Sequence, residues 1–151
     1  MVLLIFTSVL HAQGQPRLEL DIQEQKINMT ADEVSGDADI TYTPGDTIEF
    51  VILAKNTGNG IVVSPEIVDP VPSGTAYVAG SARGENCQIF FSIDKGFKYT
   101  EWPVMIQITN DEGTRVGQTA RPDQVTHIKW LVNENISAGG EKELSFRVVV
   151  R

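Results

Sequence analysis

Hydrophobic and polar residues alternate along most of the chain with a period of two, which is the pattern of a half-buried β-strand and not of a helix. The clearest run covers residues 47–55, and its inward positions are Ile48, Phe50, Ile52 and Ala54. Val51 and Leu53 make the opposite face of this run apolar as well. A strand with two apolar faces is covered on both sides, so the sequence predicts a central strand here.

Four more runs alternate in the same way. Their inward positions are expected to be Leu18, Leu20 and Ile22; Val104, Ile106 and Ile108; Ile128, Trp130 and Val132; and Leu144, Phe146, Val148 and Val150. The phase of the first run changes before Ile27 and Met29, which predicts a bulge or two short strands. Clusters of Gly, Pro, Asn and Asp separate the runs. The pattern predicts an all-β fold, a sandwich or barrel of roughly seven to nine short strands.

The chain begins with an apolar run, residues 1–10, followed by a small residue at Ala12. The run is shorter than the roughly 20 residues that cross a bilayer and matches the hydrophobic region of a signal peptide. We expect a signal peptide at 1–12 and one mature domain at 13–151, exported to the periplasm, the cell envelope or the medium. The alternative is a buried first strand. No later run predicts an integral membrane segment.

Composition restricts the class of partner. The chain is 41% hydrophobic and 21% charged, as globular proteins are, and 151 residues suffice for one domain. Its net charge of -8 argues against a nucleic-acid partner, because phosphate binding needs a basic surface. The same charge argues against docking on anionic lipid.

The order of several short segments resembles a known family. Pro-Gly-Asp at 44–46 begins the central strand, Asn-Thr-Gly-Asn at 56–59 ends it, and Asp-x-x-Pro follows at 69–72. Further matching segments stand at 75–81, 126–130 and 138–146. From about residue 18 to the end, the chain resembles the "conserved repeat" domain of bacterial surface proteins, which also occurs in the large cysteine-rich outer-membrane protein of chlamydiae. The resemblance implies an immunoglobulin-like β-sandwich on an exported protein.

The residues that carry this resemblance are expected to have structural roles; they are Gly45, Asp46, Asn56, Gly58, Asp69, Pro72, Trp130 and Gly139. Asn56 tolerates left-handed backbone and Gly58 accepts it freely, so the chain can reverse there. Asp69 before Pro70 is expected to form an Asx turn. Trp130 is expected to fill the core of the sandwich.

No set of residues predicts catalysis. After the expected signal segment the chain has one histidine and one cysteine, which cannot build a usual zinc site. A Ser-His-acid triad needs a base beside its nucleophile, and nothing in the pattern places a serine beside the one histidine. We therefore expect no enzyme activity and no cofactor. Alternation places His127 beside Lys129, away from the core. It places Cys87 with Ile89 and Phe91 in the core, with an intermolecular disulfide as the alternative.

Two groups of residues predict binding without catalysis. Oxygen ligands for Ca²⁺ could come from Asp32, Asp37, Asp39 and Asp46, although their spacing is not that of an EF-hand and a solvated acidic loop is the other interpretation. Tyr42, Tyr99 and Trp102 could stack on a sugar, unless their loops fold back over the core.

The leading hypothesis is therefore a non-catalytic exported module, a structural or binding component of the cell envelope, with a protein or glycan partner that the sequence does not identify. The alternatives are a carbohydrate-binding module and a calcium-stiffened, adhesin-like domain. We expect contacts at the loops or at an exposed sheet edge. The first strand, within residues 17–29, is the best candidate for an edge that accepts an added strand.

Overall fold

A computed structural model describes residues 14–36 and 39–151, so the expected signal segment and Asp37 lie outside the described residues. The strands are β1 (Leu18–Lys26), β2 (Thr47–Asn56), β3 (Glu66–Pro70), β4 (Thr75–Tyr77), β5 (Arg83–Gly84), β6 (Cys87–Ser92), β7 (Met105–Thr109), β8 (Arg115–Thr119), β9 (His127–Val132) and β10 (Glu141–Val150). The short helices are α1 (Ala31–Ser35) and η1 (Pro122–Gln124).

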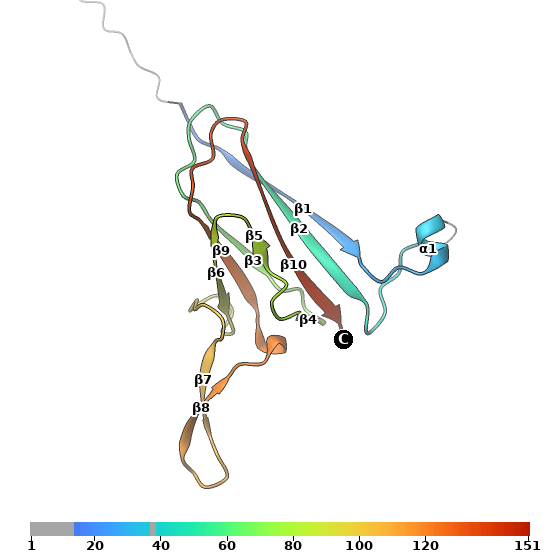
Figure 1. Ribbon diagram of the computed structural model, residues 1–151, viewed down its shortest axis with the longest axis vertical. Helices are drawn as coiled ribbons and strands as arrows, with labels where there is room; N and C mark the ends of the chain where they lie inside the picture. Colours follow the sequence, from blue (N-terminus) through green and yellow to red (C-terminus); the bar gives the residue numbers. More distant parts are fainter. Residues whose placement is uncertain (1–13, 37–38) are drawn as a thin grey trace, which may run out of the picture.

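All strand pairs among the described residues are antiparallel, which confirms the all-β class. One sheet has the order β1-β2-β10-β4, with β5 also paired to β10, and the other has the order β3-β9-β6 (Figure 1). Within the described part of the chain, strands β7 and β8 pair only with each other. The described residues hold ten strands, more than expected, because β4 and β5 are separate pieces of three and two residues.

The central strand is confirmed. Strand β2 lies between β1 and β10, and its inward residues Ile48, Ile52 and Ala54 are buried. Phe50, the fourth inward residue, stacks on Phe146 of β10 with ring centroids 5.2 Å apart. Cross-strand aromatic pairs of this kind stabilise the sheet.

The bulge expected in the first strand is wrong. Strand β1 pairs with β2 without interruption, from Leu18 opposite Asn56 to Lys26 opposite Ile48. The change of phase at Ile27 has another cause: the strand ends at Lys26, and the chain leaves the sheet there.

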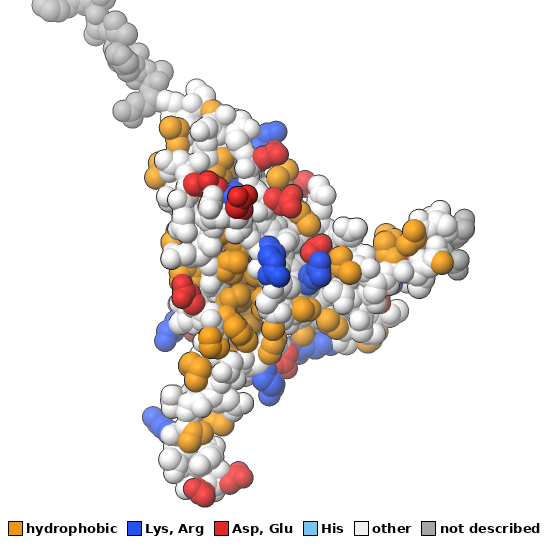
Figure 2. Space-filling model, viewed as in Figure 1, with side chains coloured by type: hydrophobic (Ala, Val, Ile, Leu, Met, Phe, Trp, Pro, Cys, Tyr) orange, Lys and Arg blue, Asp and Glu red, His pale blue; other side chains and the backbone are white. Residues whose placement is uncertain are grey.

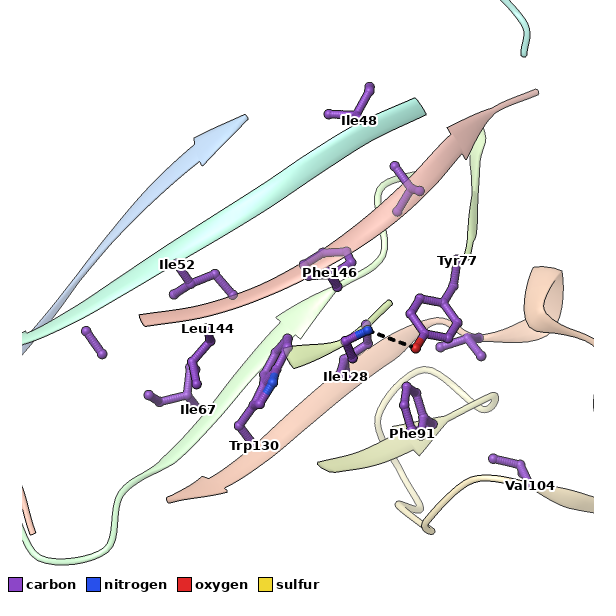
Figure 3. Packing of buried hydrophobic residues seen from close by; sticks show 14 of the residues in the cluster. Ile48, Ile52, Ile67, Tyr77, Phe91, Val104, Ile128, Trp130, Leu144 and Phe146 are labelled. Atoms are coloured by element: carbon purple, nitrogen blue, oxygen red, sulfur yellow. Dashed lines mark hydrogen bonds between the residues drawn. The ribbon is translucent and has the colours of Figure 1, made fainter. Parts of the chain in front are cut away.

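The core lies between the two sheets, whose apolar faces meet (Figure 3). Ile52, Leu144 and Phe146 come from the first sheet, and Ile67, Ile128 and Trp130 from the second. Trp130 is fully buried, and its ring centroid is 6.0 Å from that of Phe146. Burial of each such large side chain contributes about 1.5–3 kcal/mol, so this layer is the main source of stability.

Two segments project from the body. The hairpin β7–β8 extends from one end, and the segment between β1 and β2, which carries α1, extends from another side (Figure 1). Hydrophobic side chains are visible on both projections in Figure 2. The exposed hydrophobic residues of these segments include Val34 and Ile40 near α1, 71% and 51% exposed, and Met105 in β7, 59% exposed.

Candidate functional site: the open edge of β1

Strand β1 is an edge strand, as expected for residues 17–29, and one side of its backbone has no partner strand among residues 14–36 and 39–151. The carbonyl of Arg17 accepts the Thr57 N–H, and the Ile27 N–H donates to Thr47, so odd-numbered residues point their backbone groups at β2. Even-numbered residues therefore point theirs outward. The N–H and C=O groups of Leu20 and Ile22 form an open template for another strand.

The residues that offer these open backbone groups also form an apolar stripe. Leu20 and Ile22 lie on the same face of the sheet as the core residues Ile52 and Ala54 opposite them. Even so, they are 47% and 49% exposed. The three-stranded second sheet covers β2 and β10 and leaves this part of β1 open, so the inward face of the edge remains accessible.

The edge is acidic. Glu19, Asp21 and Glu24 are exposed along β1, and Glu24 is the carboxylate on the same face as Leu20 and Ile22. The Tyr42 hydroxyl donates to Glu24 at 3.4 Å, so an aromatic ring from the α1 segment stands at the far end of the apolar stripe. The edge thus combines open hydrogen-bonding groups, an apolar stripe and negative charge.

Three buried charged side chains hold the α1 segment beside this edge. Lys26 Nζ is 2.9 Å from Glu33 Oε1 and 3.0 Å from Asp46 Oδ2. The ammonium group donates a third hydrogen bond to the carbonyl of Thr41 at 2.9 Å. Thr30 and Glu33 also form a capping box, in which each side chain bonds the backbone N–H of the other. The three contacts of Lys26 join the end of β1 to the segment that follows it, and the capping box lies within that segment.

The cluster keeps its groups ionised. The Thr30 backbone N–H and the Lys26 ammonium lower the pKa of Glu33 to about 2. The Thr43 backbone N–H and Lys26 lower the pKa of Asp46 to about 2. Hydrogen bonds to these two carboxylates raise the pKa of Lys26. Sequence reasoning missed this cluster, because Lys26 reads as an ordinary polar residue at a strand end.

Acid is expected to release the α1 segment before it unfolds the sheets. Because both carboxyl pKa values are depressed in the folded state, their stabilisation is present above the ordinary values of 4.5 and 3.8 and is lost as pH falls from about 5 to about 2. Amide hydrogen exchange should show early loss of protection at Thr41 and Thr43, while Phe146 stays protected. Equal protection of these amides at pH 6 and pH 2.5 would contradict the prediction. Asp39→Asn, at an exposed carboxylate, is the control and should leave the profile unchanged.

The calcium candidates are not brought together among the described residues. Asp46 is engaged by Lys26 and by Asn28, whose amide donates to Oδ1 at 3.0 Å. Asp39 is exposed, whereas the side chain of Asp32 and all of Asp37 lie outside the described residues. No group of three or more His, Cys, Asp or Glu in the described part of the chain could hold a metal ion.

The motif glycines act in two different ways. Gly45 and Gly139 have φ angles of 96° and 76°, which favour glycine. Gly58 does not have the left-handed backbone that we expected. A Cβ on Gly58 would instead lie 2.2 Å from the carbonyl oxygen of Gln15, and one on Gly60 would lie 2.3 Å from that of Gly14. Glycine is needed here because the segment before β1 crosses the loop at van der Waals distance.

The other motif residues lie in the sheets or in their loops. Asn56 has no left-handed backbone; its fully buried side chain binds the loop after β2. The turn expected at Asp69 is wrong, because Asp69 and Pro70 continue β3 opposite β9, and burial raises the pKa of Asp69. Pro72 accepts the Thr75 N–H in the next turn. Trp130 fills the core, as expected.

The aromatic candidates do not form one surface. Trp102 packs edge-on against Phe91, with ring centroids 5.7 Å apart, so this loop folds back over the core. Tyr99 is half-buried beneath the Lys129 ammonium, 5.0 Å from its ring centroid. Tyr42 lies far along the chain, beside β1. Phe97, 88% exposed, is the aromatic side chain of this loop that faces solvent.

The remaining polar candidates lie where alternation predicted. His127 is half-buried in β9, and its Nδ1 is 3.2 Å from the Thr126 hydroxyl. Cys87 is a free cysteine at the margin of the core, where burial raises the pKa of its thiol. No helix in the described ranges is both long and apolar enough to span a bilayer.

Comparison with family models, with curated proteins and with solved structures finds no match in any of the three. The interpretation of the site therefore depends on its own geometry.

Proposed function

We propose that this chain is a non-catalytic, exported, immunoglobulin-like module that binds by adding an extended segment of a partner to the open edge of β1. The observation that carries the proposal is the coincidence, at Leu20 and Ile22, of outward backbone groups with exposed apolar side chains. Backbone hydrogen bonds would supply affinity, and the alternate side chains would supply specificity.

The immunoglobulin-like assignment is supported by two facing antiparallel sheets with a buried tryptophan between them. It is also supported by the resemblance of residues 18–151 to the conserved repeat domain of bacterial surface proteins. Export is supported by the apolar residues at the start of the sequence. A role in the cell envelope fits a small module with an open sheet edge, because such edges join proteins without catalysis.

A pair of proline variants tests strand addition. Proline at position 22 removes an N–H that points away from β2, so Ile22→Pro should keep the fold with only a small change in melting temperature. Proline at position 23 removes an N–H that bonds β2, so Gln23→Pro should lose stability. Decapeptides selected from a random display library against the wild-type protein should bind Ile22→Pro at least about tenfold more weakly.

Two outcomes would count against the proposal. The first is a set of selected peptides that bind Ile22→Pro as tightly as the wild type. The second is a set of selected peptides that bind elsewhere on the protein. In that case the amide groups of Leu20, Ile22 and Glu24 would exchange hydrogen equally fast with and without peptide.

A further inference from the structure

The hairpin β7–β8 has the properties of an incomplete sheet. Its strands have five residues each and pair with no other strand among the described residues. A two-stranded hairpin is at best marginally stable in water, and a third strand or a packed face stabilises it. Every residue of β8 is exposed. Something that covers β8 would therefore stabilise the hairpin.

The backbone groups of β8 leave a second open edge. The Ala120 N–H donates to Val104, and the Asn110 N–H donates to Thr114, so even-numbered residues of the hairpin face across it. Arg115, Gly117 and Thr119 therefore point their N–H and C=O groups away from β7. This edge is five residues long and lies on the projection remote from β1 (Figure 1).

We propose that β8 of one copy adds antiparallel to β1 of a second copy, so that the hairpin of each protein extends the first sheet of the next. This inference rests on the proposed strand addition at β1 and names its partner. In the register that we infer, Glu24 lies opposite Arg115, Ile22 opposite Gly117 and Leu20 opposite Thr119. All five residues of β8 are then paired.

Charge favours this register. Arg115 makes no ion pair with any described residue, and Glu24 is the carboxylate on the apolar face of β1. Directly opposite charges stabilise a strand pair, whereas like charges destabilise it. Two copies of β1 would instead bring acidic edges together, which disfavours symmetric pairing of β1 with itself.

Side-chain volume also fits. Gly117 has no side chain, and the Met105 methyl group lies 3.6 Å from the place where its Cβ would be. Ile22 of the second copy would lie opposite this gap and pack against Met105, which is 59% exposed. The contact would bury the apolar stripe of β1 and the exposed methionine together.

The geometry predicts open-ended, head-to-tail assemblies of many copies and not closed dimers. Because β1 and the hairpin lie on different parts of the molecule (Figure 1), a pair of copies joined by one contact keeps one free β1 edge and one free β8 edge. Such head-to-tail contacts continue unless rotation closes a ring. An interface this small is expected to be weak, below about 1,200 Å², so assembly should depend on concentration.

Sedimentation equilibrium of the purified protein tests the proposal. The weight-average mass should rise reversibly above that of the monomer as concentration increases, and less so at high salt. Glu24→Arg and Arg115→Glu should each weaken association at least about tenfold. An equimolar mixture of the two variants should associate again, because each chain then offers an edge that matches the other. Glu85→Arg, at an exposed carboxylate away from both edges, is the control and should associate as the wild type does.

Three results would overturn the inference. A wild-type protein that stays monomeric at millimolar concentration removes self-addition. If selected peptides still bind the β1 edge of that monomeric protein, strand addition at β1 is supported and only the proposal that a second copy is the partner is rejected. Association that survives both single charge reversals shows that copies meet through another surface. A mixture that stays monomeric rejects the pairing of Glu24 with Arg115.

Discussion

Trp130→Ala should lower the free energy of unfolding by about 3–5 kcal/mol, the usual cost of removing a large buried aromatic side chain. Trp130 is fully buried at the point where the two sheets meet, against Phe146. Its indole N–H donates to the carbonyl of Arg83 at 2.9 Å. The substitution therefore creates a cavity and leaves the carbonyl of a short strand without its donor.

This loss is large compared with the roughly 5–15 kcal/mol that stabilises an ordinary domain. Urea unfolding followed by circular dichroism measures it, and Trp130→Phe is the conservative control. Phenylalanine keeps most of the packing but lacks the N–H donor, so we expect a smaller loss, about 1–2 kcal/mol. Trp102, which is half-buried at the margin, should tolerate alanine better. If Trp130→Ala unfolds at the same urea concentration as Trp102→Ala, Trp130 does not join the sheets as described.

Alternation of hydrophobic residues was sufficient to locate three of the strands that form the core. Residues 47–55, 126–132 and 144–150 correspond to β2, β9 and most of β10. Their inward positions are buried, except Phe50 and Val150, which are partly buried against the core. The signal is strong here because the opposite sheet covers one face of each of these strands along most of its length. A period of two then reports directly which side chains leave water.

The same signal does not show whether a face is covered. Leu20 and Ile22 alternate just as Ile48 and Ile52 do, yet only the second pair is buried. The difference arises from the width of the opposite sheet, which has three strands and ends before β1. The number of strands in the opposite sheet depends on the pairing of segments that are distant in the sequence. The local pattern of hydrophobic residues therefore cannot predict it. This is why the sequence predicted an edge strand but not its exposed apolar stripe.

Contacts between distant segments also explain the errors at the motif residues. Gly58 was interpreted as a residue that permits a turn, but it is required because the backbone of Gln15 passes close to it. Lys26 was not singled out, although its ammonium joins two carboxylates that lie 7 and 20 positions further along the chain. In both cases the residue is required by a contact that forms only in the folded chain and that the pattern of neighbouring residues does not reveal.

Asn56→Asp, at the last residue of β2, should be strongly destabilising although it exchanges a single amide nitrogen for oxygen. The Asn56 side chain is fully buried. Its Nδ2 donates to the carbonyls of Gly60 at 2.7 Å and Ile136 at 2.9 Å. Its Oδ1 accepts the backbone N–H groups of Arg17 and Gly58. One amide thus joins the segment before β1, the loop after β2 and the loop before β10.

Aspartate keeps the acceptor but replaces the donor with a second oxygen, which faces two carbonyl oxygens out of contact with water. We expect a loss of about 2–4 kcal/mol at pH 7, from two unsatisfied carbonyls and a buried charge. Burial and these carbonyls should raise the pKa of the new carboxyl group, so its protonated form is the one that folds better. The deficit relative to the wild type should therefore shrink as pH falls below the raised pKa.

Asn59→Asp is the matched control, since Asn59 is exposed and uses its Oδ1 only as an acceptor, for the Gln15 N–H. Thermal unfolding of the wild type and both variants at pH 7 and pH 4 separates the two positions. Asn59→Asp should follow the wild type at both values. If Asn56→Asp also follows it, or if its deficit stays constant with pH, then the amide of Asn56 does not hold the three segments together. The crossing of residues 14–17 over the loop would in that case depend on close glycine packing alone.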